Sequence, residues 1–86
     1  MTERQLKITR ALLDALNALE GGQMTEPLLH AELSLRVTPT ASLAEFNDAL
    51  ELCDTNGWLT GVKAKHRNGR VWCINEAGMA ARLELR

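Results

Sequence analysis

The chain has 86 residues, 45% of them hydrophobic, and a formal net charge of −1, which together indicate one small globular domain. No apolar run reaches the about 18 residues that a transmembrane helix needs, and the polar Met-Thr-Glu-Arg start is unlike a signal peptide. The two cysteines, Cys53 and Cys73, suit a reducing compartment better than a disulfide framework. We therefore expect a cytoplasmic protein that does not enter a membrane.

The charges are distributed unevenly along the chain. Residues 1–60 carry four Lys/Arg against nine Asp/Glu, whereas residues 61–86 carry six Lys/Arg against two Asp/Glu. The stretch between Val62 and Trp72 contains no acidic residue, and its basic residues are Lys63, Lys65, Arg67 and Arg70. Attraction for a polyanion would therefore concentrate in the C-terminal third. The alternative is a solvated hairpin whose charges discourage association between sheet edges.

The first predicted helix begins at a capping box and ends at a glycine pair. Thr2 and Gln5 have the spacing of such a box, and the helix should reach about Glu20 before Gly21-Gly22 ends it. Residues 23–25, Gln-Met-Thr, are long enough for one short strand.

The apolar residues of this first helix spread over roughly 240° of its circumference, whereas packing on one side needs an arc of about 100°. They are Leu6, Ile8, Ala11, Leu12, Leu13, Ala15, Leu16, Ala18 and Leu19. The surplus predicts a second contact, and we expect a homodimer through this helix. The alternative is a helix wrapped deeply by its own domain.

A second and a third helix follow, separated by a turn. Pro27 suits the first helical position, and the second helix should run through about Leu35. Residues 37–40, Val-Thr-Pro-Thr, cannot easily continue a helix. Ser42 and Glu45 form the pattern of another capping box, which begins the third helix. Its apolar residues have the spacing of one buried face: Leu43, Phe46, Leu50 and Cys53.

The basic stretch predicts a β-hairpin once Asn56-Gly57 has ended the third helix. Asn68-Gly69 lies between two β-capable runs, which is the strongest short signal for a hairpin. A three-residue loop, 67–69, would place Ala64 opposite Trp72 and would separate the lysines from the apolar face. That face would then hold Val62, Ala64, Trp72 and Ile74. Asn75 can cap a short final helix reaching about Leu85.

The predicted elements follow the order helix, short strand, helix, turn, helix, basic hairpin, which resembles that of the winged helix-turn-helix regulators. Two short stretches are most similar to small bacterial repressors of the multiple-antibiotic-resistance and phenolic-acid types. Residues 50–59, LELCDTNGWL, are similar to the end of a recognition helix and the step into the wing. Residues 70–78, RVWCINEAG, are similar to the exit from the wing. The resemblance implies one α+β winged-helix domain over residues 1–86, with three helices, a short strand, a two-stranded wing and a short C-terminal helix.

The resemblance also implies a site for double-stranded DNA and a role in transcription regulation. In that family the outward face near the start of the third helix enters the major groove, and the wing touches the backbone or minor groove. Here Asn47 could read adenine, while Thr40 and Ser42 could bond to phosphate. Phosphate contacts from the wing would come from Lys63, Lys65, Arg67 and Arg70.

A second reading is a winged-helix module that binds protein and not DNA. The third helix carries four negative charges where phosphates would approach, and no Lys or Arg lies between Val37 and Val62. The acidic residues are Glu45, Asp48, Glu51 and Asp54. The basic wing favours DNA, whereas the acidic helix favours a protein partner.

Neither an enzyme nor a cofactor site is expected. The chain has no recognisable nucleophile–base pair and no Gly-rich phosphate loop. The spacing of Cys53, His66 and Cys73 matches no common zinc motif and lacks a fourth ligand. Trp58 and Trp72 should be core residues.

Overall fold

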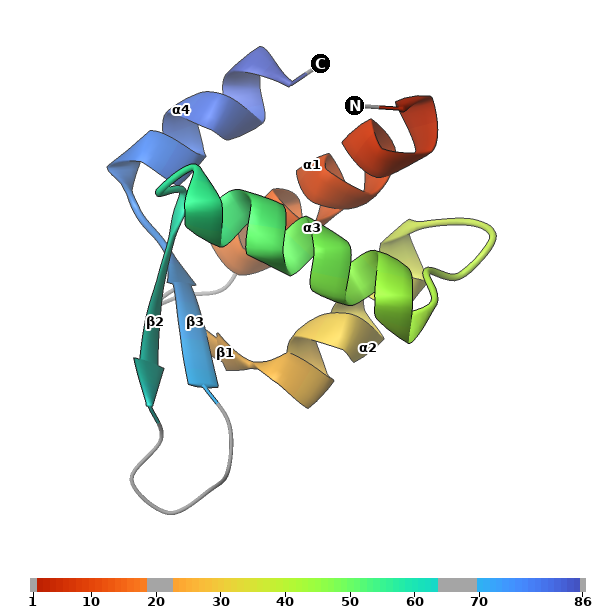
Figure 1. Cartoon of the computed structure of the whole chain (residues 1–86), viewed down its shortest axis with the longest axis horizontal. Coiled ribbons are helices and arrows are strands. Elements are labelled where there is room, and N and C mark those ends of the chain that lie inside the picture. The colour runs from red at the N-terminus through yellow and green to blue at the C-terminus, as the bar shows by residue number, and fades with distance from the viewer. Residues whose placement is uncertain (1, 19–22, 64–69, 86) are drawn as a thin grey trace.

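The computed structural model describes residues 2–18, 23–63 and 70–85; of residues 62, 63 and 70 it describes the backbone alone. The described residues form four helices and a three-stranded antiparallel sheet (Figure 1). The elements are α1 (Glu3–Ala18), β1 (Gln23–Thr25), α2 (Glu26–Arg36), α3 (Leu43–Thr55), β2 (Leu59–Lys63), β3 (Arg70–Ile74) and α4 (Glu76–Glu84). This α+β order is the predicted one. None of these helices has the length and apolar character needed to cross a bilayer.

Capping residues set the predicted helix starts. The Thr2 amide donates to Gln5 Oε1 at 2.9 Å and the Gln5 amide donates to Thr2 Oγ1 at 3.1 Å, so the first capping box is confirmed. At α4 the Gly78 amide donates to Asn75 Oδ1 at 2.9 Å. The predicted stop at Gly21-Gly22 lies outside the described residues.

Helix α1 lies at the centre of the domain, where it contacts α2, α3, α4 and β3 (Figure 1). Leu12, Leu13 and Leu16 are completely buried, and Ala15 is only 2% exposed. The wide apolar arc is therefore covered largely by the domain itself, which was the alternative reading. The arc no longer requires a partner, and the homodimer through this helix stays a prediction.

Helix α3 buries three of its four predicted core residues. Phe46, Leu50 and Cys53 are buried, but Leu43 is 61% exposed, so its predicted burial is wrong. Leu43 is the first residue of the helix, and Ala41, just before the Ser42 cap, is 2% exposed and packs into the core at this end. The apolar spacing identified the correct face but not the point at which the core ends.

The hairpin register differs from the predicted one. The sheet order is β1-β3-β2, and Gly61 of β2 lies opposite Trp72 of β3, where we expected Ala64. The strands end at the Lys63–Arg70 pair, so the predicted three-residue loop at 67–69 is wrong, and residues 64–69 lie outside the described part. Trp72 explains the register, because a Cβ on Gly61 would lie 2.9 Å from the indole ring. Only glycine leaves that space open.

Trp72 joins the sheet to α2. Its indole Nε1 donates to Glu26 Oε1 at 3.0 Å, and the residue is 3% exposed. Met24 of β1 lies opposite Trp72 on the other side of β3. The predicted core position of Trp72 is confirmed, while Trp58 is half-buried and packs against the core.

Gly78 is needed where α4 crosses the start of the hairpin. A Cβ at this position would collide with the Trp58 carbonyl oxygen and would lie 2.7 Å from Ile74 Cγ1. We expect Gly78→Ala to lower the free energy of unfolding by about 1–3 kcal/mol, because the Trp58 carbonyl oxygen can move away from the new Cβ only if the backbone shifts. Urea denaturation measures this difference.

The control for Gly78→Ala is Ala80→Gly at an exposed position of the same helix. It should lose about 1 kcal/mol through helix propensity alone. If Gly78→Ala were as stable as the wild type or more stable, the close approach of α4 to Trp58 would be refuted.

Candidate nucleic-acid interface

The predicted interface comprises the start of α3 and the β2–β3 hairpin. The hairpin follows α3 directly through the turn at Asn56-Gly57, where Gly57 has a φ of +73°. Figure 1 shows α3 running across the front of the molecule, with the turn before α3 at one end and the hairpin leaving the other. The two predicted DNA-contacting regions thus flank one helix.

Three of the predicted contact residues lie in α3 or in the turn just before it. Thr40, Ser42 and Asn47 are all exposed. Ser42 Oγ accepts a hydrogen bond from the Glu45 amide at 3.1 Å, so its hydroxyl hydrogen is still free to be donated. These groups can supply neutral donors and acceptors to a nucleic acid backbone or base edge.

The basic residues of the hairpin are placed only in part. Lys63 and Arg70 pair across β2 and β3 at the ends of these strands. Lys65, Arg67 and His66 lie outside the described residues. The backbone therefore places two cationic residues at the same level of the hairpin.

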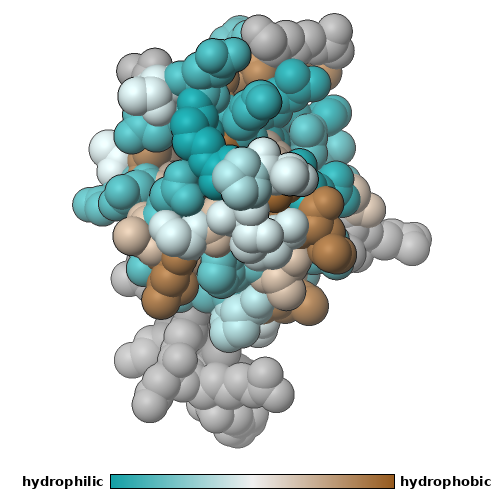
Figure 2. Space-filling model, turned by 90° about the vertical axis from the view of Figure 1, so that its right-hand side faces the viewer, coloured by the Kyte–Doolittle hydropathy of each residue, from teal (hydrophilic) through white to brown (hydrophobic). Residues whose placement is uncertain are grey.

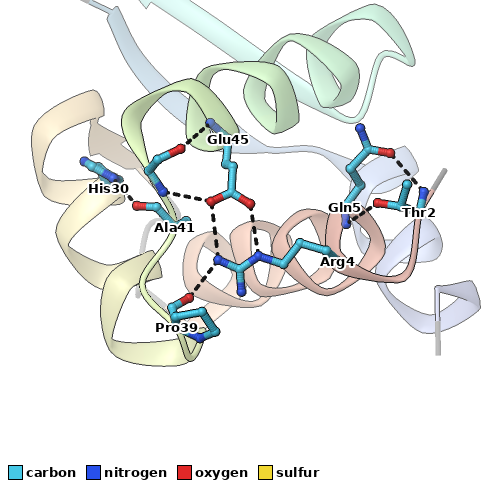
Figure 3. Close-up of polar contacts among 8 residues, drawn as sticks. Thr2, Arg4, Gln5, His30, Pro39, Ala41 and Glu45 are labelled. Carbon is cyan, nitrogen blue, oxygen red and sulfur yellow. Dashed lines mark hydrogen bonds and ion pairs between the residues drawn. The ribbon is translucent and has the colours of Figure 1, made fainter.

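An ion pair links α1 to the first turn of α3 (Figure 3). Arg4 Nε donates to Glu45 Oε2 at 3.0 Å, and Arg4 Nη2 donates to Glu45 Oε1 at 3.3 Å. The same Nη2 donates to the Pro39 carbonyl oxygen at 2.7 Å. Glu45 also accepts from the Ser42 amide at 3.1 Å, which completes the second predicted capping box. One side chain, Arg4, thus holds both the turn and the first turn of α3 against α1.

The ion pair changes the charge balance of α3. The hydrogen bond from Arg4, followed by the one from the Ser42 backbone, lowers the pKa of Glu45 to about 2. Glu45 is therefore ionised, and the positive charge of Arg4 compensates its negative charge. Asp48, Glu51 and Asp54 are exposed, and none of them forms an ion pair within the described part of the chain.

The lowered pKa of Glu45 predicts a specific acid dependence of stability. The pKa of Glu45 in the folded protein lies below the ordinary value of 4.5, so its carboxylate stabilises the folded state at pH values above 4.5. The contribution is lost as the pH falls from 4.5 towards 2. The difference in urea midpoint between the wild type and Glu45→Gln should therefore close over this interval.

Arg4→Met removes the larger of the two causes of the lowered pKa of Glu45, so it should reduce this pH dependence, while the hydrogen bond from the Ser42 amide retains part of it. A gap between wild type and Glu45→Gln that stayed constant down to the lowest pH would show that the ion pair does not form in solution.

His30 supports the start of α3 from the opposite side. Its Nε2 lies 3.1 Å from the Ala41 carbonyl oxygen, and it must donate there because a carbonyl only accepts. The imidazole also packs against Phe46, with the ring centroids 4.9 Å apart. His30 is therefore half-buried between α2 and the start of α3.

Neither cysteine is placed as a metal ligand. Cys53 is fully buried, and burial raises its pKa to about 12. Cys73 is half-buried on β3, where its Sγ donates to the Thr60 carbonyl oxygen at 3.5 Å. Among the described residues, no group of three or more His, Cys, Asp or Glu could hold a metal ion.

The comparisons with known proteins show a likeness in structure and none in sequence. No family model matches the chain, and no curated protein sequence matches it. Among solved structures, the chain is similar to the circadian-clock-associated protein Pex from Anabaena, with a TM-score of 0.63 and 19% identity. The match covers 95% of this chain and 72% of that chain. The likeness shows the fold. Because one fold hosts many functions, the function must be argued from the site.

Proposed function

We propose that this protein is a small winged helix-turn-helix DNA-binding protein that regulates transcription. In this reading α2 and α3 form the helix-turn-helix, and β2 with β3 forms the wing. The observation that carries the proposal is the position of a hairpin rich in basic residues directly after α3. Exposed polar residues lie at the start of that helix and just before it: Thr40, Ser42 and Asn47. The fold shared with Pex supports this arrangement of elements.

Each group has a distinct part in the proposed contact with DNA. Asn47 reads a base edge in the major groove, and the hydroxyls of Thr40 and Ser42 bond to phosphate. The wing supplies the electrostatic attraction through Lys63, Lys65, Arg67 and Arg70. Arg4 does not touch DNA in this proposal but positions the turn before α3 through Glu45 and the Pro39 carbonyl.

Binding by a single domain should be weak, because Asp48, Glu51 and Asp54 repel phosphate from the same helix. Fluorescence anisotropy with a mixed-sequence duplex at about 50 mM salt should give a dissociation constant on the order of 10⁻⁶–10⁻⁴ M. The logarithm of the association constant should fall with the logarithm of salt by about 0.9 for each phosphate contact. Absence of binding at this salt concentration would refute the proposal.

The exposed acidic residues of α3 favour a second candidate, a module that binds a basic protein surface. The double variant Glu51→Gln/Asp54→Gln separates the two candidates. Removing these charges should tighten DNA binding if α3 approaches phosphate, because like-charge repulsion is relieved. If DNA binding is unchanged, α3 does not face the duplex, and the protein-binding reading takes over.

A homodimer would place two wings on one duplex and compensate for weak binding by each domain. Ala15 is buried, so an α1 interface would have to use what remains accessible on that helix. Met79 and Leu83 of α4 are 45% and 54% exposed and offer another apolar surface. Sedimentation decides the matter, and a clean monomer of 9.5 kDa would exclude the dimer.

A further inference from the structure

A groove of about 530 Å³ lies between α1 and the end of α2. We call it the α1–α2 groove. One wall is a single face of α1, with Lys7, Arg10 and Asp14 at the spacing i, i+3 and i+7. The other wall is the last residue of α2 and the turn after it, with Arg36 and Thr38. Two segments of the chain thus bring three cationic side chains to one groove.

Two of these three cations are unpaired. Lys7 and Arg36 are exposed, and neither forms an ion pair within the described part of the chain. The acidic residues one helical turn before them, Glu3 and Glu32, do not pair with them. The charges of Lys7 and Arg36 are therefore available to a ligand.

The acidic residue in the lining, Asp14, is compensated from outside the groove. Asp14 Oδ1 accepts a hydrogen bond from Arg82 Nη1 at 3.2 Å, and Arg82 belongs to α4 and does not line the groove. Asp14 Oδ2 lies 3.9 Å from Arg10 Nε. Because Arg82 compensates the carboxylate, Asp14 does not cancel the charge of Arg10 within the groove. The net charge of the lining is positive, which selects an anion.

We infer that the α1–α2 groove binds a small anion with two linked phosphoryl groups. A terminal phosphoryl group carries about 1.5–2 negative charges near neutral pH, so one group alone leaves cationic charge unmatched, whereas two can match all three cations. The planar guanidinium groups of Arg10 and Arg36 fit phosphate oxygens, and Lys7 and Thr38 add an ammonium and a hydroxyl donor. The volume of the groove falls within the ~300–1,000 Å³ of sites that hold small molecules.

The α1–α2 groove is separate from the proposed DNA contacts. None of the residues that line it is among those assigned to the duplex. Figure 1 shows the turn after α2 and the hairpin at opposite ends of α3, so the groove and the wing are different basic surfaces. Binding of a small phosphate compound in the groove does not depend on whether the protein binds DNA.

Pyrophosphate, inorganic phosphate and malonate test the chemical class of the ligand. Titrations of the ¹⁵N-labelled protein at constant low ionic strength should give pyrophosphate a dissociation constant on the order of 0.1–1 mM. Inorganic phosphate, with one phosphoryl group, and malonate, with two carboxylates, should each bind at least about fivefold more weakly. The amides that shift should be those of residues 7–14 and 36–38.

Two double variants with the same change in net charge assign the site. Lys7→Gln/Arg36→Gln removes one cation from each wall and should weaken pyrophosphate binding by about tenfold. Both residues are exposed, so the fold should be retained. Lys63→Gln/Arg70→Gln on the hairpin is the matched control, since it also replaces one lysine and one arginine. It should change pyrophosphate binding by less than about twofold.

The absence of a saturable shift with pyrophosphate up to about 10 mM would overturn the inference. Binding of inorganic phosphate or malonate as tight as that of pyrophosphate would also overturn it. Equal losses in the two double variants, or shifts confined to the hairpin, would show general attraction of anions to basic surfaces and not a defined site in the groove.

Discussion

Replacing Phe46 by alanine should lower the free energy of unfolding by about 3–5 kcal/mol. Phe46 is 1% exposed at the centre of the core, and its ring packs against His30, so its removal leaves a cavity and loosens the start of α3. A domain of this size has a total stability on the order of 5–10 kcal/mol. The variant should therefore be near the limit of folding at room temperature.

Urea denaturation followed by circular dichroism measures this loss. Leu43→Ala is the matched control, because Leu43 lies one turn earlier on the same helix and is 61% exposed. It should change stability by no more than about 0.5 kcal/mol. Similar losses for the two variants would contradict the orientation of α3 described above.

The second large effect concerns the wing. The double variant Lys63→Glu/Arg70→Glu should weaken DNA binding by about a hundredfold, and its salt dependence should flatten by about 0.9 for each phosphate that the wing no longer neutralises. The two residues lie opposite each other on β2 and β3. They carry charges of the same sign before and after the change, so the repulsion between them within the hairpin is similar in both proteins. Anisotropy titrations over a range of salt concentrations give both quantities.

Lys7→Glu/Arg10→Glu is the control for the wing variant, since it changes the net charge equally on exposed positions of α1. It should affect DNA binding only weakly. If both double variants weaken binding to the same extent, net charge and not the wing drives the interaction.

Local signals were sufficient for the elements of the fold. The capping residues Thr2, Ser42 and Asn75 each bond as their sequence spacing predicts, because a cap involves only neighbours along the chain. Pro27 and Gly57 mark boundaries through backbone geometry that is equally local. The order of elements followed from these signals.

Features that depend on long-range packing were not predictable in this way. The hairpin register is set by the volume of Trp72 over Gly61, which alternation of apolar and polar residues does not express. The breadth of the apolar arc on α1 reflects neighbours from α2, α3, α4 and β3, which the helix alone does not reveal. The register error arose because the hairpin was considered apart from the residues that pack on it. The coverage of α1 by its own domain does not test the homodimer, which stays a prediction.

In the candidate site, too, local features were predictable from the sequence and long-range contacts were not. Exposure of Thr40, Ser42 and Asn47 followed from the position of the third helix, and it is confirmed. Figure 2 shows hydrophilic side chains over much of one face of the molecule, with a few separate hydrophobic patches among them, so hydropathy alone does not mark a nucleic-acid site. The pairing of Arg4 with Glu45 joins residues 41 positions apart, and the capping pattern gave no sign of it. That pairing removes one of the four acidic charges that argued against DNA.

A chemical-shift footprint with duplex DNA tests the central proposal most directly. On addition of a mixed-sequence duplex at low salt, the amides of residues 40–47 and of the β2–β3 hairpin should shift together, and those of α4, such as Met79 and Leu83, should not. A footprint confined to α4 or to α1, or no footprint at all, would contradict the proposal that α3 and the wing bind DNA.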